Sequence, residues 1–161
     1  MPSRDDIKMV DVSTLLSYLS ESHKYYVEER LPHIEFHLKR IIDACPDKFG
    51  NTINRFFSEY KDEVSNHFKY EEDVVFPYIN SLYNKSQKPE FTISEFKSNH
   101  SNIEDKLNDL MNILIKYLPS NIFPKERVEI SIDIMEITSD LNCHTLVEER
   151  ILVPLVEMME D

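Results

Sequence analysis

Apolar side chains recur every three to four residues along most of the chain, which is the spacing of one face of an α-helix. The pattern predicts four long helices, over residues 13–44, 51–83, 92–118 and 124–159. The first apolar stripe comprises Leu15, Leu16, Leu19, Tyr26, Val27 and Leu31, and the second comprises Phe56, Phe57, Tyr60, Val64, Val74, Val75 and Tyr78. Because no run of alternating β-branched residues interrupts this pattern, we expect an all-α fold.

The ends of these helices carry local signals. Pro32 lies inside the first helix and should kink it, because proline removes one backbone hydrogen bond. Residues 92–95 (Thr-Ile-Ser-Glu) form a capping-box pattern, and Pro124 suits a first helical turn. The connections are short, over residues 45–50, 84–90 and 119–123. Short loops between long helices make neighbours antiparallel, which predicts an up-down-up-down four-helix bundle, with residues 1–161 as a single domain.

Composition narrows the classes of partner. The formal charge of −12 lacks the basic footprint of a nucleic-acid-binding protein and disfavours anionic membranes, so we expect neither partner. Gly50 is the only glycine, which excludes a glycine-rich phosphate loop. Acidic residues near the amino terminus stand where a signal peptide would be apolar, and no apolar run approaches the roughly 18 residues that span a bilayer. With neither a CxxC motif nor a disulfide framework, Cys45 and Cys143 are expected to be reduced packing residues of a cytoplasmic protein.

An internal repeat carries the functional argument. His23, His67 and Glu71 each recur 77 positions later, as His100, His144 and Glu148, and Glu72 and Pro77 recur as Glu149 and Pro154. Each half of the chain is therefore a helical hairpin with a histidine on its first helix and His-x-x-x-Glu on its second. A single His-x-x-x-Glu is expected by chance in this composition, and single histidines are usually ordinary core or surface residues. Two such motifs in register with two further histidines are not readily explained by chance.

The spacing allows these six side chains to meet. Residues four apart project from the same helix face, so His67 lies over Glu71, as His144 lies over Glu148. His23 and His67 lie at similar distances from the first turn, and His100 and His144 at similar distances from the third connection. In antiparallel helices, equal distances from a turn give equal heights, so all six side chains can share one layer.

Buried imidazoles and carboxylates need partners, and metal ions are the simplest ones. Imidazole with carboxylate suits iron, manganese or zinc. Two carboxylates at the centre of a bundle favour a pair of metals, and di-iron is the commonest chemistry in such bundles.

These motifs resemble the hemerythrin-like HHE domain family, and most closely its iron–sulfur cluster repair members (the RIC family). The resemblance covers nearly the whole chain, from His23 through Leu31-Pro32 and the 67–77 block to the 144–154 block. It implies two non-haem iron ions, bridged by two carboxylates and completed by four terminal imidazoles. The implied bridging residues are Glu71 and Glu148, and the implied terminal ligands are His23, His67, His100 and His144.

The chain departs from its relatives in identifiable ways. Relatives often carry an added amino-terminal module with paired cysteines, which we do not expect here. The spacing from His23 to Leu31-Pro32 is one residue longer than in those relatives, and Ala44 and Cys45 stand where many of them have a further histidine. The oxygen-carrying hemerythrins have His-x-x-x-His on the third helix, where this chain has Glu104 four residues after His100. A carboxylate there makes the site more electron-rich, which weighs against simple oxygen carriage.

Three functions follow as expectations. The first is a di-iron protein that handles oxidative or nitrosative stress or repairs iron–sulfur clusters, with oxygen or nitric oxide as ligand and iron–sulfur proteins as partners. The second is an oxygen-binding or oxygen-sensing module, and the third is a metal-dependent regulatory bundle without turnover. Glu104 and Tyr26 are candidates for an extra ligand or for a group that supports the ligands. His33 and His37, four apart, indicate a surface pair or a minor site, because about 21 Å of helix separates His37 from His23.

Overall fold

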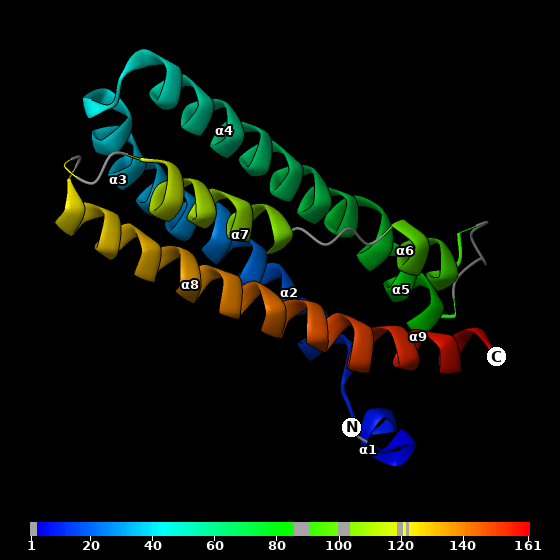
Figure 1. Ribbon diagram of the computed structural model, residues 1–161. Coiled ribbons are helices and arrows are strands. Elements are labelled where there is room, and N and C mark those ends of the chain that lie inside the picture. The colour runs from blue at the N-terminus through cyan, green and yellow to red at the C-terminus, as the bar shows by residue number, and fades with distance from the viewer. Residues whose placement is uncertain (1–2, 86–90, 100–103, 119–120, 122) are drawn as a thin grey trace. The chain divides into compact units, whose positions relative to one another are not determined.

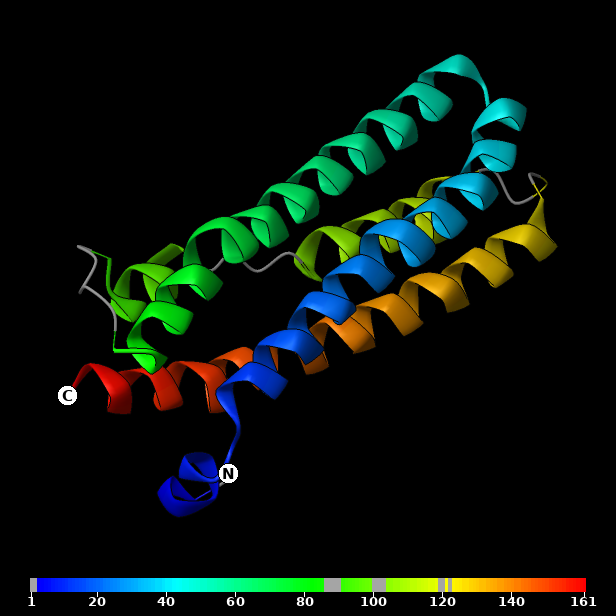
Figure 2. The same ribbon diagram turned by 180° about the vertical axis from the view of Figure 1, so that it is seen from behind.

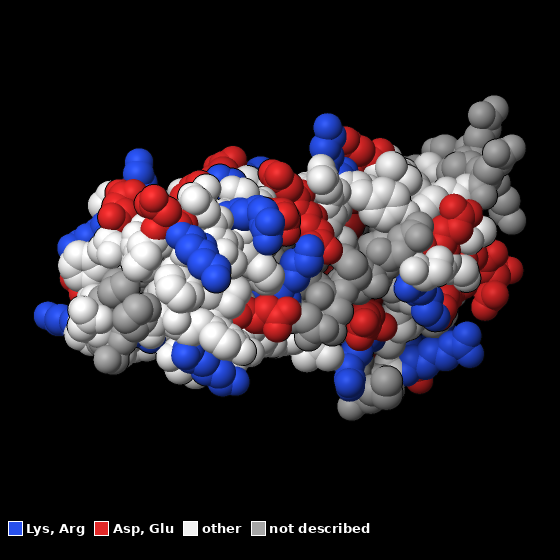
Figure 3. All heavy atoms as spheres, turned by 45° about the horizontal axis from the view of Figure 1, so that its top comes forward, with Lys and Arg blue, Asp and Glu red and all other residues white. Residues whose placement is uncertain are grey.

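The computed structural model describes residues 3–85, 91–99, 104–118, 121 and 123–161, without the side chains of residues 99, 104 and 105. All regular structure within these ranges is helical, and they contain no strand, which confirms the all-α prediction (Figures 1 and 2). In this part of the chain no helix combines the length and the apolar character that crossing a bilayer requires. On the face drawn in Figure 3, acidic and basic side chains are interspersed, unlike the basic stripe of a nucleic-acid-binding surface.

The helices follow the predicted segments closely. The first segment comprises α2 (Val12–Lys24), the π-helical η1 (Tyr25–Arg30) and α3 (Leu31–Ala44). The second comprises α4 (Asp47–Tyr70), the π-helical η2 (Glu71–Val75) and α5 (Phe76–Tyr83). The third comprises α6 (Ile93–Asn99), α7 (Glu104–Asn112) and the π-helical η3 (Ile113–Tyr117). The fourth comprises α8 (Pro124–Val147), the π-helical η4 (Glu148–Leu152) and α9 (Val153–Glu160).

One further helix, α1 (Arg4–Lys8), precedes the predicted segments. Ser3 and Asp6 form a capping box there, in which the Ser3 hydroxyl accepts from the Asp6 amide at 3.2 Å and the Asp6 carboxylate accepts from the Ser3 amide at 2.9 Å. These two contacts satisfy amides that a short helix leaves unpaired. The apolar period did not indicate α1, because five residues hold too few apolar positions to show one.

The chain forms two compact units, each assembled from separate stretches of sequence. The first unit comprises Met1–His23, His67–Ser101 and Asn142–Asp161, and the second comprises Lys24–Asn66 and Asn102–Leu141. The long helices α4 and α8 each contribute residues to both units.

In the first unit, α9 packs against α1, α5 and α6. Its buried core includes Leu16, Leu19, Val75, Phe76, Ile79, Ile93, Phe96, Leu152 and Val156. The Glu160 carboxylate at the end of α9 accepts the amide of Ile93 at 2.8 Å and also the hydroxyl of Tyr78. The first amide of α6 is therefore satisfied by a residue 67 positions away, which the local capping-box pattern at residues 92–95 could not indicate.

In the second unit, aliphatic side chains line the helices with the predicted period. Its buried residues include Leu31, Ile34, Leu38, Ile41, Ile53, Phe57, Tyr60, Val64, Leu107, Leu110, Leu114, Ile130, Ile134 and Ile137. A Cβ atom at Gly50 would lie 2.9 Å from the carbonyl oxygen of Ile42, so the close approach of α3 and α4 at this turn requires glycine. Arg127 donates from Nε to the Leu114 carbonyl at 2.9 Å, which joins α8 to η3.

Among the described residues, each of the four π-helical segments ends two residues before a proline, and these prolines are Pro32, Pro77, Pro119 and Pro154. Where the helix continues through the proline, the preceding residue donates its amide five positions back, as Val153 does to Glu148. Proline cannot donate a hydrogen bond, and its ring crowds the carbonyl four residues before it. A wider turn accommodates that ring, so the predicted disturbance at Pro32 takes the form of a π-helical segment.

The π-helical segments also explain two errors in the predicted apolar stripes. Val27 is 38% exposed and Val74 is 39% exposed, although both were placed on buried faces. In a wider turn, the residue that lies on the same helix face as position i is i+4 or i+5. Val75, four residues after Glu71, is accordingly buried, while Val74 turns outward.

Candidate metal centre

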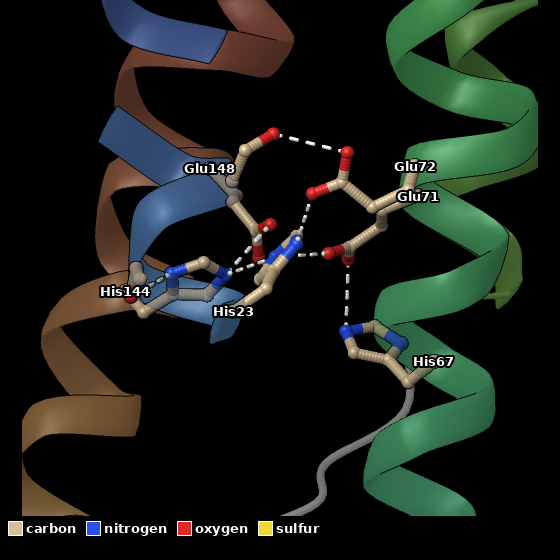
Figure 4. Close-up of polar contacts among 8 residues, drawn as sticks. His23, His67, Glu71, Glu72, His144 and Glu148 are labelled. Atoms are coloured by element: carbon tan, nitrogen blue, oxygen red, sulfur yellow. Dashed lines mark hydrogen bonds and ion pairs between the residues drawn. The ribbon is translucent and has the colours of Figure 1, made fainter. Parts of the chain in front are cut away.

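Five of the six predicted ligands come together in the first unit (Figure 4). His23 lies near the end of α2, and two pairs lie where a long helix passes into a π-helical segment. These pairs are His67 with Glu71 and His144 with Glu148. Each pair keeps the i, i+4 relation that directs both side chains to one helix face. Both glutamates are the first residue of a π-helical segment, so the repeat seen in the sequence recurs in the backbone.

Glu71 lies between two imidazoles. Its Oε2 atom is 2.9 Å from His23 Nε2, and its Oε1 atom is 2.9 Å from His67 Nε2. The residue is fully buried, and neither carboxylate oxygen has a hydrogen bond of acceptable geometry. Since a buried carboxylate is costly without compensation, this geometry favours a cation between the oxygens and the ring nitrogens.

His144 and Glu148 form the second half of the centre. His144 Nε2 lies 3.2 Å from Glu148 Oε1 and 3.2 Å from His23 Nε2. Four buried residues each offer one donor atom, and these four atoms all lie within 4.8 Å of one another. The residues are His23, Glu71, His144 and Glu148. Two imidazole nitrogens and two carboxylate oxygens thus converge on a space the size of a coordination sphere.

Outer contacts orient the two buried histidines. The Nδ1 atom of His23 lies 2.8 Å from the Glu72 carboxylate, which also accepts the Ser20 hydroxyl at 3.0 Å. His144 Nδ1 lies 3.1 Å from the hydroxyl of Ser22. When Glu72 accepts the Nδ1 proton, the Nε2 lone pair of His23 faces the centre, as in carboxylate–histidine–metal arrangements.

Aromatic rings enclose the histidines. Phe68 stacks on His23 with ring centroids 4.2 Å apart and meets His144 edge-on at 5.7 Å. Phe76 lies parallel to His23 at 5.6 Å on centroids. These rings hold the imidazoles in place and exclude water, which strengthens electrostatic interactions within the centre.

The charges of the centre act on His23. Burial by itself lowers the pKa of His23, but Glu71, Glu72 and Glu148 more than offset that effect, so its pKa lies above the ordinary value. The acidic surroundings thus favour positive charge at this position, and a metal cation would replace the proton there.

The donor set fits a transition-metal centre. Imidazole and carboxylate donors suit iron, manganese and zinc. The buried Glu71 oxygens, which lack hydrogen bonds, and the converging Nε2 atoms of His23 and His144 are the features that such a metal would satisfy.

The other residues predicted at or near the centre are not all placed there by the structure. His100 lies outside the described residues, and so does the side chain of Glu104, whose backbone begins α7. Tyr26 is buried in η1 and belongs to the second unit, so its role at the centre stays a prediction. Glu149, beside the ligand Glu148, is exposed.

Sequence reasoning missed part of the surroundings. The repeat singled out Glu72 but assigned it no contact, and no sequence pattern indicated a role for Ser20, Ser22 or Phe68. The serines lie near His23 in sequence, but only the fold brings Ser22 to His144, 122 positions away. Both cysteines are free, as expected, but Cys143 is exposed and therefore not a packing residue, because it points away from the face that carries His144.

Comparison with known families agrees with this centre. The model of the hemerythrin HHE cation-binding domain matches residues 14–157, nearly the whole chain. The chain belongs to the hemerythrin HHE family. No curated protein and no solved structure matches it significantly. Family membership and the buried His and Glu cluster together identify a hemerythrin-like protein with a metal-binding site.

Proposed function

We propose that the chain is a non-haem di-iron protein whose two irons are held by His23, His67, Glu71, His100, His144 and Glu148. Glu71 carries the proposal, because its two oxygens face two different imidazoles at 2.9 Å. That arrangement suits a carboxylate that gives one oxygen to each metal. Glu148 occupies the matching position of the repeat and takes the second bridging role.

The proposal includes the architecture around the centre. The two helical hairpins form one up-down-up-down four-helix bundle and one domain, residues 1–161, in which His100 completes the ligand set. The helix order, the match over residues 14–157 and the 77-residue repeat support this arrangement.

Metal content tests the ligand set. Anaerobically purified protein reconstituted with ferrous iron should hold two irons per chain, and Glu71→Gln should hold one or fewer, because an amide cannot bridge two cations as a carboxylate does. Asp73→Asn, which changes an exposed carboxylate two residues after Glu71, is the matched control and should keep both irons. One iron or none in the wild-type chain, or full loading of Glu71→Gln, would overturn the assignment.

The activity that fits best is the handling of oxidative or nitrosative stress, including repair of iron–sulfur clusters in partner proteins in the cytoplasm. Ferrous ions bound here would supply electrons and open positions for oxygen or nitric oxide. The chain supplies a dry, acidic enclosure, with Phe68 and Phe76 against His23 and the three glutamates Glu71, Glu72 and Glu148 around it. Negative charge near the metals stabilises the oxidised state, which favours irreversible reaction over reversible binding.

Oxygen binding or sensing is the second candidate, and family membership favours it, because hemerythrin domains commonly bind small ligands such as oxygen. Stopped-flow absorption spectra of the reduced protein separate the two functions. Stress handling predicts rapid, irreversible oxidation by oxygen or nitric oxide, or iron transfer to an apo iron–sulfur protein. A spectral change that forms in air, lasts minutes and reverses when oxygen is removed would instead establish oxygen binding. A chain that binds metal but responds to neither gas would match a regulatory bundle without turnover.

A further inference from the structure

A second group of metal-ligating side chains lies in the second unit, on helices α3 and α8. His33 and His37 are one turn apart on α3, with ring centroids 4.6 Å apart. Asp133 of α8 places its Oδ2 atom 3.3 Å from His33 Nε2. One donor atom from each of the three residues lies within 4.8 Å of the other two. The iron-binding proposal uses none of these residues.

Neighbouring side chains hold this group in position. Arg30 donates from its guanidinium to the main-chain carbonyl of Asp133 at 3.4 Å and to the Glu136 carboxylate at 3.2 Å. Both bonds run from η1 to α8, so they fix the turn that carries the Asp133 carboxylate. Phe36 meets the ring of His37 edge-on at 5.4 Å, which restricts rotation of that imidazole.

The group is open to solvent on one side. The His33 side chain is 50% exposed and the Asp133 side chain is 21% exposed. The Glu136 carboxylate pairs with the charge of Arg30, so the nearest guanidinium does not oppose a cation with its full charge. Cations therefore reach the three donors directly from water.

We propose that His33, His37 and Asp133 form a second site for a divalent transition-metal ion of the Zn²⁺ class. Two imidazoles and one carboxylate are the donor set of open zinc sites, in which water or another ligand fills the fourth position. Histidines at i and i+4 on one helix face suit a single tetrahedral ion. The bound ion joins α3 to α8, and its remaining position faces solvent.

Titration with Zn²⁺ tests this site in protein as purified, with its native metal retained in the buried centre. Isothermal calorimetry should show one additional zinc ion per chain, and zinc should raise the melting temperature. The variants His37→Gln and Asp133→Asn should each weaken this binding by at least about tenfold, since losing a ligand costs no less than losing a group that supports one. Both variants should retain the wild-type content of native metal and the wild-type circular dichroism.

Asp140→Asn is the matched control, because Asp140 is exposed on the same helix, about two turns from Asp133, and lies outside the group. Its affinity for Zn²⁺ should equal that of the wild-type chain. As a second readout, Cu²⁺ bound at this site should give an electron paramagnetic resonance spectrum with two coupled nitrogens, and His37→Gln should reduce it to one. No saturable Zn²⁺ binding, or equal binding by all variants, would overturn the proposal without affecting the iron centre.

Discussion

At the scale of single residues, the buried centre depends on groups that do not face it. Glu72 illustrates this, because it is 39% exposed at the side chain and lies 2.8 Å from Nδ1 of His23. Through that contact it fixes which ring nitrogen carries the proton and leaves Nε2 directed at Glu71 and His144. Its counterpart in the repeat, Glu149, is exposed.

Glu72→Ala should lower the affinity for the metal by about 10–100-fold, because His23 loses the partner that orients its ring. Competition with a chromogenic chelator measures the affinity. Asp73→Ala, which removes an exposed carboxylate next to Glu72, is the control and should leave the affinity unchanged. Equal losses in the two variants would indicate a general effect of surface charge instead of orientation of His23.

At the scale of the secondary structure, the prolines decide where the glutamate ligands sit on their helices. Glu71 and Glu148 each open a π-helical segment that ends two residues before a proline. The Val153 amide donates to the Glu148 carbonyl across the wider turn. A regular α-helical turn at this place would rotate the residues on either side relative to each other and change the direction of the ligand.

Pro154→Ala tests this role. Alanine restores an amide and removes the ring that crowds the preceding turn, so η4 should revert towards a regular α-helix. We expect total helicity to stay the same while metal affinity falls, because loss of the wide turn rotates α9 relative to α8 and shifts Glu148 at their junction. Pro124→Ala, at the first turn of α8, is the control and should affect only stability. Unchanged metal affinity in Pro154→Ala would show that the π-helical segment does not position the ligand.

A second feature at this scale is the contact that joins α5, α6 and α9. The Glu160 carboxylate accepts the Tyr78 hydroxyl, and burial, together with Glu160, raises the pKa of Tyr78 well above its usual range. A raised pKa in the folded state means that the unfolded chain loses this proton first. The stability from Tyr78 is therefore complete below about pH 10, the ordinary value, and is lost as the pH rises above it.

Denaturation by urea between pH 8 and pH 11.5 checks this sign. The free energy of unfolding should fall more steeply above about pH 10 in the wild-type chain than in Tyr78→Phe, which has no proton to lose. Tyr83→Phe, which changes a tyrosine that is 51% exposed, should keep the wild-type slope. Identical slopes for Tyr78→Phe and Tyr83→Phe would contradict the assigned role of Tyr78.

At the scale of the whole molecule, the metal centre joins stretches that are distant in sequence. The first unit gathers residues from the start, the middle and the end of the chain, and His23, His67 and His144 come one from each stretch. A cation bound by all three stretches acts as a cross-link in the folded state, where it also offsets buried negative charge.

Removal of the metal should therefore lower the melting temperature substantially. A ligand present at about 1,000 times its dissociation constant stabilises the folded state by about 4 kcal/mol. Scanning calorimetry of holo protein and of protein stripped with a chelator under reducing conditions measures the difference, and ferrous iron should restore it. In Glu71→Gln, the melting temperatures of the metal-loaded and stripped forms should differ little. Its apo state no longer buries an uncompensated carboxylate, and its metal is weakly held. Equal melting temperatures for holo and apo wild-type protein would exclude a structural role for the metal.

The sequence alone determined the features that depend on local periodicity and on repetition. The apolar period located the long helices to within a few residues, and the 77-residue repeat identified the histidines and glutamates that the structure brings together. These inferences work because residues four apart share a helix face whatever the rest of the fold does. The period failed at Val27 and Val74, where a downstream proline widens the turn and rotates the side chains.

Only the tertiary structure decided which distant groups meet. It brought Ser22 to His144, Glu72 to His23, Glu160 to the first amide of α6, and Asp133 to His33. None of these contacts follows from spacing along one helix, because each depends on how helices far apart in sequence pack and on the rotation that π-helical turns introduce. Residue types and period thus specify the ligands, whereas packing specifies the groups that orient them.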